Sequence, residues 1–245
     1  MKTSIYKIQS NRALRSDIYE MKLKGDTSSI KAPGQFVNIK IEGLYLRRPI
    51  SICDWDQNQL TIIYKVVGEG TERMARMAPG QELDILGPLG NGYDLDKIEA
   101  GAKEKRPLLI GGGVGIPPMY GLAKALLDRK VPPEVILGFN KSEEIFYEKE
   151  FKDLGVDVKV TTANGSYGIE GFVTDATKNP GYVCACGPEP MLKAVWDKAE
   201  NGQFSFEARM ACGFGGCMGC SCQTKYGAKR ICKEGPVLEK EEILW

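Results

Sequence analysis

Residues 210–222 read MACGFGGCMGCSC and place four cysteines within eleven residues, with glycine filling most of the space between them. A fifth cysteine, Cys232, follows downstream. Taken as ligands, Cys212, Cys217, Cys220 and Cys232 have the spacing Cys-x4-Cys-x2-Cys followed by eleven residues and the last cysteine. This is the plant-type arrangement for a [2Fe-2S] cluster held by four thiolates. The stretch therefore predicts an iron–sulfur site.

The glycines between these cysteines have a physical role in such a loop. A loop that wraps around a cluster turns its backbone N–H groups toward sulfur, which calls for dihedral angles that glycine tolerates. The glycines concerned are Gly213, Gly215, Gly216 and Gly219.

Two questions about the cysteines stay open at this point. A structural zinc ion with four cysteine ligands competes with the cluster, although such sites more often show paired Cys-x2-Cys knuckles than a triplet and a distant single cysteine. Counting also does not separate Cys220 from Cys222 as the third ligand; the x2 spacing favours Cys220. A [2Fe-2S] cluster passes one electron at a time, so another part of the chain has to supply or remove electrons.

The composition limits what that other part does. The 245 residues, 42% of them hydrophobic, suffice for two cores and a small appendage. A formal net charge of +1 carries no electrostatic signature of a nucleic-acid or anionic membrane partner. The chain has no histidine, which excludes Ser-His and Cys-His catalysis, so no catalytic residue is assigned. Without a signal-peptide pattern or a long apolar run, we expect a soluble cytoplasmic protein.

Residues 1–100 alternate apolar and polar positions in short runs broken by glycine, proline and asparagine. The runs are FVNIKIEG (36–43), RPISICD (48–54), LTIIYKVV (60–67) and ELDILGPLG (82–90). This pattern predicts a small antiparallel β-barrel. One short helix is expected at TERMARMA, with Thr71 as its N-cap.

Residues 101–202 change to a repeating order of strand, glycine-rich turn and helix, which predicts a doubly wound parallel sheet of the α/β class. Residues 203–245 are rich in glycine and cysteine and too poor in aliphatic side chains to form a core of their own. This last segment is expected to fold around a metal centre.

A flavin site is indicated in the predicted barrel by two short motifs. In RPIS, Arg48 suits a pyrophosphate, while the Ser51 hydroxyl and the backbone near Ile50 can reach the flavin ring. In GEGT, Gly70 and Thr71 stand at the expected start of a helix, where backbone N–H groups favour a diphosphate. Each motif alone is a weak signal, because a solvated arginine or an ordinary capped helix has the same sequence.

A nicotinamide site is indicated in the predicted sheet. GGGVGIPPM (111–119) follows an apolar run and opens a helix, as a nucleotide-binding turn does, but it departs from the dinucleotide fingerprint G-x-G-x-x-G. Its candidate contacts are Gly112, Gly113 and Gly115. Cys186 and Gly187 end a later strand, and a pair this small lets a flat nicotinamide approach a flavin.

In this order along the chain, the motifs resemble the ferredoxin-NADP reductase superfamily with a C-terminal [2Fe-2S] segment, and within it the electron transfer subunits of dihydroorotate dehydrogenase B. The resemblance covers essentially the whole chain and rests on RRPISI, YKVVGEGT, LGPLGNGY, GGGVGIPPM and ARMACGFGGCMGCSCQT with the trailing CKEGPV. It implies an FAD-binding β-barrel domain at 1–100, an NAD-binding α/β domain at 101–202 and a [2Fe-2S] segment at 203–245.

The resemblance also implies contacts and partners. The residues that would contact FAD are Arg48, Pro49, Ile50, Ser51, Ile63, Tyr64, Lys65, Gly70 and Thr71. Electrons from dihydroorotate oxidation at the FMN of a catalytic partner subunit would pass through the cluster and FAD to NAD+, a step of pyrimidine biosynthesis, in a heterotetramer of two subunits of each type. The eleven residues before the last cysteine make one cluster loop short for the family. A reductase subunit of a sulfhydrogenase or a ferredoxin-dependent transhydrogenase, and a zinc-stabilised binding module, remain alternatives.

Overall fold

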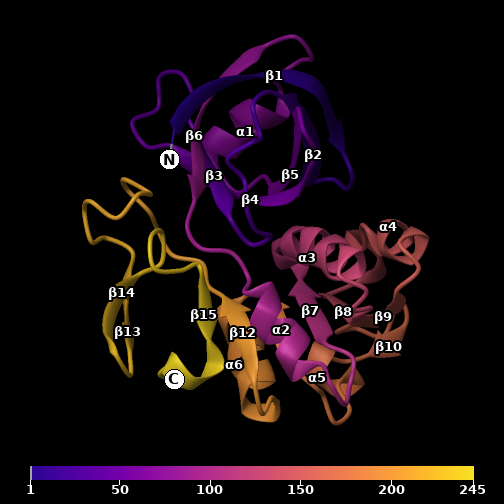
Figure 1. Cartoon of the computed structure of the whole chain (residues 1–245). Coiled ribbons are helices and arrows are strands. Elements are labelled where there is room, and N and C mark those ends of the chain that lie inside the picture. The colour runs from indigo at the N-terminus through magenta and orange to yellow at the C-terminus, as the bar shows by residue number, and fades with distance from the viewer. Residues whose placement is uncertain (1) are drawn as a thin grey trace.

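The computed structural model describes residues 2–245 and places a β-barrel beside an α/β sheet, with the cysteine-rich segment next to both (Figure 1). The barrel closes in the strand order β1-β2-β5-β4-β3-β6, and all neighbouring strands are antiparallel. The strands are β1 Lys2–Ala13, β2 Ile18–Lys24, β3 Phe36–Ile39, β4 Arg48–Trp55, β5 Gln59–Lys65 and β6 Glu82–Leu89. Alternate residues such as Val37, Ile39 and Ile85 form its core. The predicted barrel is confirmed.

The short helix of the barrel, α1, spans Glu69–Ala75, so its N-cap is Gly68 and the predicted cap at Thr71 is wrong. The Thr71 hydroxyl accepts hydrogen bonds from the backbone N–H groups of Val67 and Gly68 at 3.0 and 3.3 Å and donates to the Gly68 carbonyl at 2.9 Å. Threonine at the third helical position reaches back to the start of the helix, as the second half of a capping box does. The helix therefore begins three residues earlier than expected.

Seven strands form the sheet in the order β10-β9-β8-β7-β11-β12-β15. The first six are parallel, and β15 pairs antiparallel with β12. The strands are β7 Leu108–Gly112, β8 Glu134–Phe139, β9 Asp157–Thr162, β10 Ile169–Glu170, β11 Val183–Cys186, β12 Gly202–Ser205 and β15 Val237–Glu239. The chain leaves β7 in one direction for β8 and β9 and returns on its other side with β11 and β12. This is the predicted doubly wound sheet.

Helices cover the sheet and join it to the barrel. They are α2 Leu95–Gly101, α3 Ile116–Asp128, α4 Glu148–Asp153, α5 Val173–Ala176 and α6 Glu189–Lys198, with short 3-10 turns at Gly113–Gly115, Ser142–Glu144 and Lys240–Glu242. Helix α3 meets barrel strand β4 closely, because a Cβ on Gly121 would lie 2.5 Å from the carbonyl oxygen of Cys53. In residues 2–245, no helix combines the length and the hydrophobicity needed to cross a membrane.

The cysteine-rich segment shares its core with both larger parts. Its own sheet is a hairpin of β13 Ser221–Thr224 and β14 Gly227–Arg230. Cys220 and Cys232 belong to a buried cluster that includes Phe36 of the barrel and Leu238 of β15. Strand β12 runs across the expected boundary at residue 202, and β15 returns the chain to the large sheet. Residues 203–245 are therefore part sheet and part cysteine loop.

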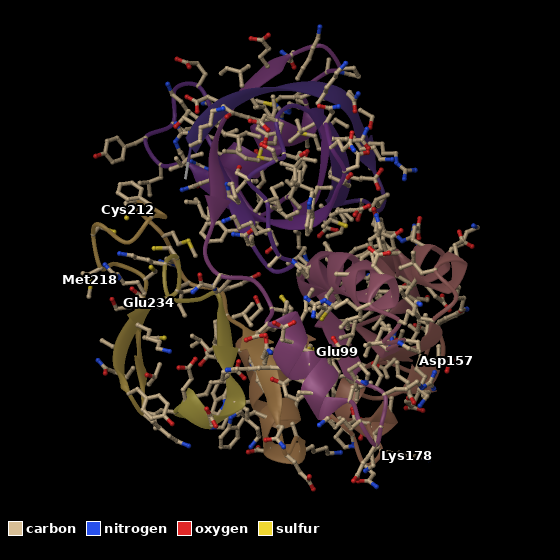
Figure 2. All side chains as sticks on the ribbon, viewed as in Figure 1. Glu99, Asp157, Lys178, Cys212, Met218 and Glu234 are labelled. Carbon is tan, nitrogen blue, oxygen red and sulfur yellow. The ribbon has the colours of Figure 1, made fainter. Side chains whose placement is uncertain are left out.

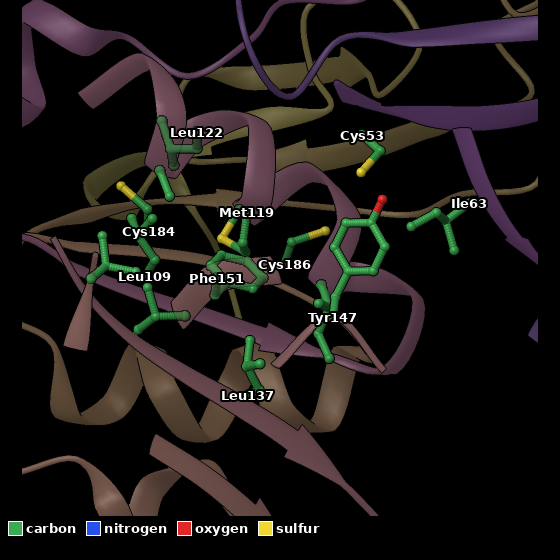
Figure 3. Packing of buried hydrophobic residues seen from close by; sticks show 14 of the residues in the cluster. Cys53, Ile63, Leu109, Met119, Leu122, Leu137, Tyr147, Phe151, Cys184 and Cys186 are labelled. Atoms are coloured by element: carbon green, nitrogen blue, oxygen red, sulfur yellow. The ribbon is translucent and has the colours of Figure 1, made fainter. Parts of the chain in front are cut away.

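A buried hydrogen-bond network joins the barrel to the sheet. The Tyr147 hydroxyl, from the loop before α4, donates to Glu20 Oε2 on β2 at 2.7 Å, and Arg12 Nε donates to Glu20 Oε1 at 2.8 Å. Glu20 is only 2% exposed. Figure 3 shows the same Tyr147 hydroxyl turned toward Cys53 of β4. The network crosses between the two parts, so it resists changes in the angle between them.

Replacement of Tyr147 by Phe is expected to lower the free energy of unfolding by about 1–3 kcal/mol, because a buried carboxylate loses one of its donors. Urea unfolding of the purified chain measures this. Tyr167→Phe is the matched control, since the Tyr167 hydroxyl donates to Glu148 at an exposed position. Equal stability of Tyr147→Phe and the unsubstituted protein at neutral pH would refute the role of the network.

The loss of unfolding free energy in Tyr147→Phe should depend on pH, and its direction of change can be predicted. Burial by itself raises the pKa of Glu20, but the hydrogen bonds from Arg12 and Tyr147 outweigh it, and the net pKa lies below its usual value. A carboxylate with a lowered pKa in the folded state adds stability above its unfolded-state pKa, and this stability is lost as the pH falls through the folded-state value. The stability difference between Tyr147→Phe and the unsubstituted protein should therefore narrow in acid.

Candidate functional site

The outer face of β4 carries two of the predicted flavin residues. The register pairs Pro49 with Asn38 and Ser51 with Phe36 of β3, and directly opposite side chains lie on the same face of a sheet. Phe36 packs in one buried cluster with Cys220 and Cys232, whereas Cys53, further along β4, packs in another with Cys186. The face around Ser51 therefore lies between the cysteine-rich segment and the nucleotide end of the sheet.

Two other predicted flavin residues come together at the start of α1. A Cβ on Gly70 would lie 2.0 Å from Nε of Arg48, so the arginine side chain lies directly against the glycine backbone. Arg48 Nη1 also donates to the carbonyl of Leu46. A guanidinium beside first-turn N–H groups is an arrangement that suits a diphosphate. The structure thus brings the RPIS and GEGT motifs into contact.

The predicted contacts on β5 point to three different places. The Tyr64 side chain lies inside the barrel, where its hydroxyl donates to Asn11 Oδ1 at 2.9 Å and burial raises its pKa. Ile63 packs in the core between barrel and sheet. Lys65 is exposed and pairs with Asp17 at 3.3 Å. A flavin beside β5 would meet mainly its backbone. Ile50 of β4 likewise packs partly against the barrel core.

The glycine-rich turn after β7 touches the end of β11. A Cβ on Gly115 would lie 2.2 Å from the carbonyl oxygen of Cys186, and one on Gly187 would lie 3.1 Å from the backbone nitrogen of Gly112. Gly113 takes a φ of +52°. Strands β7 and β11 are the neighbours at which the strand order reverses, and ligands of doubly wound sheets bind at such a point. The five predicted nicotinamide residues therefore lie together.

The two cysteines of β11 are buried and protonated. Burial raises the pKa of Cys186 to about 12, and the nearby Glu207 carboxylate adds to the shift against a hydrogen bond with Ser205. Burial also raises the pKa of Cys184, which packs in the core. The reactive form of cysteine is the thiolate. Cys186 is therefore a small neutral wall of this site and not a nucleophile.

The four predicted ligand cysteines form two pairs. In the first pair, the N–H of Cys217 points at Sγ of Cys212 at 3.4 Å. In the second pair, the N–H of Cys232 points at Sγ of Cys220 at 3.4 Å. Two thiol pairs fit a [2Fe-2S] cluster, in which each iron takes two cysteine ligands. Among residues 2–245, no three Cys, Asp or Glu side chains gather to hold a single metal ion.

The hairpin β13–β14 explains how eleven residues suffice before the last cysteine. It brings the chain back so that Ile231 N–H donates to the Cys220 carbonyl at 3.1 Å. Cys222 lies within β13 opposite Lys229. The backbone N–H of Cys232 points at Sγ of Cys220. This geometry favours Cys220 over Cys222 as the third ligand.

The glycines of the loop have two different roles. Gly213 and Gly215 take φ values of +76° and +89°, as expected of glycine in a cluster loop. Gly216 and Gly219 instead direct their N–H groups to Sγ of Cys212 and Cys217 at 3.3 and 3.5 Å. Figure 2 shows Cys212, Met218 and Glu234 together in this part of the molecule, far from Asp157 and Lys178.

Three supporting residues were not predicted. Arg230 donates to the Gly215 carbonyl at 2.6 Å and pairs with Glu234, which ties the hairpin to the first cysteine loop. The sequence could have indicated this pair, because Arg230 and Glu234 carry opposite charges four residues apart on either side of Cys232. Asn38, which donates to the Cys212 carbonyl at 3.4 Å, had no signal, because a polar residue at an alternate strand position is ordinarily solvated.

Known proteins resemble this chain over nearly its whole length. A model of the iron-sulfur cluster binding domain of dihydroorotate dehydrogenase B matches residues 207–244, and a model of the oxidoreductase NAD-binding domain matches residues 109–197. The dihydroorotate dehydrogenase B (NAD+) electron transfer subunit of Fusobacterium nucleatum is 45% identical and covers 99% of both chains. That of Bacillus pumilus is 40% identical and covers 99% of this chain and 98% of the relative.

Solved structures share the fold. A chain of the NADH-dependent reduced ferredoxin-NADP oxidoreductase superposes with a TM-score of 0.84 at 27% identity, covering 100% of this chain and 91% of the other. The cytochrome b5 reductase domain of Ulva prolifera nitrate reductase, at 18% identity, has a TM-score of 0.62 over 78% of this chain and 89% of its own. The iron–sulfur match argues against the zinc alternative. The chain belongs to the family of dihydroorotate dehydrogenase B (NAD+) electron transfer subunits.

Proposed function

We propose that this chain passes electrons from dihydroorotate oxidation, at the FMN of a catalytic partner subunit, through a [2Fe-2S] cluster and FAD to NAD+, as a step of pyrimidine biosynthesis. The observation that carries the proposal is the position of the outer face of β4, between the two thiol pairs and the turn at Gly115. Flavin exchanges electron pairs with nicotinamide and single electrons with a cluster.

The residues of the chain have separate tasks in this scheme. Arg48 and Gly70 hold the diphosphate of FAD, and Pro49 and Ser51 support its ring on β4, with the backbone of β5 alongside. The glycine turn and Cys186 leave room for the nicotinamide to lie against the flavin. The four paired cysteines hold the cluster at the opposite end of the same face. We propose that the parts 1–100, 101–202 and 203–245 carry these three tasks, with β12 and β15 of the last part completing the large sheet.

The dihydroorotate chemistry belongs to a partner in this proposal. Phe214 and Met218 lie in the cysteine loop with 46% and 52% of their surfaces exposed. Apolar side chains around a cluster suit a surface that a partner covers. We propose that the FMN subunit docks there, in a cytoplasmic heterotetramer of two subunits of each type. This would place the cluster between FMN and FAD.

A second candidate has the same cofactors and a different partner. The structural likeness to the NADH-dependent reduced ferredoxin-NADP oxidoreductase supports a role as a transhydrogenase component. The curated relatives, at 45% and 40% identity, favour the first reading. Addition of the catalytic dihydroorotate subunit separates the candidates, because only the first predicts NAD+ reduction that depends on dihydroorotate.

The proposed electron path is tested on the purified chain by itself. We expect NADH, added under anaerobic conditions, to bleach the flavin and to produce the low-temperature EPR signal of a reduced [2Fe-2S] cluster. Iron, sulfide, zinc and flavin are measured on the same sample. Zinc without flavin, or flavin bleaching without the EPR signal, would contradict the path.

A further inference from the structure

Asn38 is a polar residue buried outside the barrel core. It lies on β3, and only 1% of its surface is exposed. Its neighbours Val37 and Ile39 belong to the barrel core, so the carboxamide of Asn38 points away from that core. The cysteine-rich segment covers it there.

The cysteine loop lies directly on this carboxamide. Asn38 Nδ2 donates to the backbone carbonyl of Cys212 at 3.4 Å. A Cβ on the next residue, Gly213, would lie 2.4 Å from Nδ2, and Gly213 also takes a φ of +76°. Any side chain at position 213 would displace the amide. The first ligand cysteine is therefore held against a barrel strand through Asn38.

On its other side, Asn38 neighbours strand β4, which carries the proposed flavin contacts. Asn38 pairs with Pro49 of β4, at the spacing of neighbouring strands, about 4.8 Å. Arg47 Nη1 donates to the Asn38 carbonyl at 3.3 Å and to Asp84 Oδ1 at 2.8 Å, which fixes β3 beside its neighbours. One residue thus contacts a cluster ligand and lies next to a proposed flavin contact.

The carboxamide also has an unused acceptor. Asn38 Oδ1 is buried and has no hydrogen-bond partner among residues 2–245. A buried oxygen without a donor is costly, and its presence in a native protein calls for an explanation such as a bound group. FAD bound on the outer face of β4, as proposed above, would bring N–H and O–H donors to the neighbouring strand.

We propose that Asn38 is a positioning residue that joins the flavin to the cluster: Nδ2 holds the Cys212 backbone, and Oδ1 accepts a hydrogen bond from an N–H or O–H group of FAD. The inference rests on the proposed function, because it requires FAD on the outer face of β4. When bound, FAD would accept the two electrons of a hydride from NADH and pass them one at a time to the cluster. Asn38 sets the separation that each electron crosses.

The test compares Asn38→Leu, which keeps the approximate size and removes both polar groups, with Gln59→Leu. Gln59 is a matched control, because its amide lies on barrel strand β5 and bonds only the exposed Gln9 side chain in the described part of the chain. We expect Asn38→Leu to weaken FAD binding to flavin-depleted protein about tenfold. The Raman bands of bound flavin should shift as well. Gln59→Leu should change neither.

Rapid-mixing experiments give the second measurement. After NADH addition, Asn38→Leu should bleach its bound flavin at the normal rate but develop the cluster EPR signal at least about tenfold more slowly. Gly213→Ala keeps the amide and displaces it, so it should slow the same step. This second variant also covers the case in which Asn38→Leu does not fold.

The outcomes separate the inference from the function on which it rests. Normal FAD affinity, unshifted Raman bands and a normal rate of cluster reduction in Asn38→Leu would overturn the role of Asn38, as would a normal rate in Gly213→Ala. Failure of the unsubstituted protein to show the NADH-dependent EPR signal would instead overturn the proposed electron path.

Discussion

Cys232→Ser is expected to remove the [2Fe-2S] cluster and to leave the flavin reducible by NADH. Cys232 and Cys220 form one of the two thiol pairs, so its loss takes away half of the ligands of one iron. Soft thiolate ligands select iron–sulfur clusters, and a serine hydroxyl is a poor substitute. We expect the iron and sulfide content to fall at least about tenfold, with loss of the EPR signal.

Cys222→Ser is the matched control for this experiment. Cys222 lies two residues beyond Cys220, opposite Lys229 in the hairpin, and should be replaceable without loss of iron. NADH oxidation by an artificial two-electron acceptor should persist in both variants, because it needs only the flavin. Cluster loss in Cys222→Ser with retention in Cys220→Ser would move the third ligand to Cys222. Retention in Cys232→Ser would reject the ligand set.

Arg48→Ala should weaken FAD binding by about 10- to 100-fold. A hydrogen bond to a charged group contributes about 1.5–3 kcal/mol, and each 1.4 kcal/mol is a factor of about ten. Gly70→Ala should act in the same direction without removing the charge, because its Cβ would occupy the place of Arg48 Nε, 2.0 Å away. Fluorescence titration of flavin-depleted protein with FAD measures both.

Gly68→Ala is the control at the same turn. Apart from its two neighbours in the chain, no residue of 2–245 has an atom within 4 Å of the position that its Cβ would take, and its φ of 169° is extended backbone that alanine adopts. Gly68→Ala should therefore bind FAD normally. An affinity of Arg48→Ala equal to that of Gly68→Ala would place the diphosphate elsewhere.

The outline of the fold could be predicted from the sequence because it depends on local patterns. Alternation in runs such as 36–43 and 60–67 predicts strands wherever one face is buried, and a glycine turn between an apolar run and a helix predicts a parallel sheet. The predicted N-cap of α1 was wrong, because the Thr71 side chain caps the helix from within its first turn and not from the N-cap position. No local pattern in the sequence indicated that β15 pairs with β12 in the large sheet.

The candidate site was predictable in part for the same reason. The cysteine spacing indicated the cluster without any tertiary information, and the glycine and arginine motifs indicated where cofactors would lie. Tyr64 and Lys65 show what a motif cannot predict. The motif identified the strand, but the Tyr64 side chain points into the barrel and the Lys65 side chain points into solvent. Burial follows from packing against distant elements.

The cofactor classes could be inferred from the amino-acid sequence, because thiolate spacing and glycine turns are short-range features that a few residues define. How these sites connect depends on the three-dimensional fold. Asn38 and Cys212 are 174 positions apart in the sequence and are joined by a hydrogen bond. Gly115 and Cys186 are also distant in the sequence and lie in close contact. Such contacts arise when barrel, sheet and hairpin bury their apolar faces against one another. Local periodicity carries no record of which faces meet.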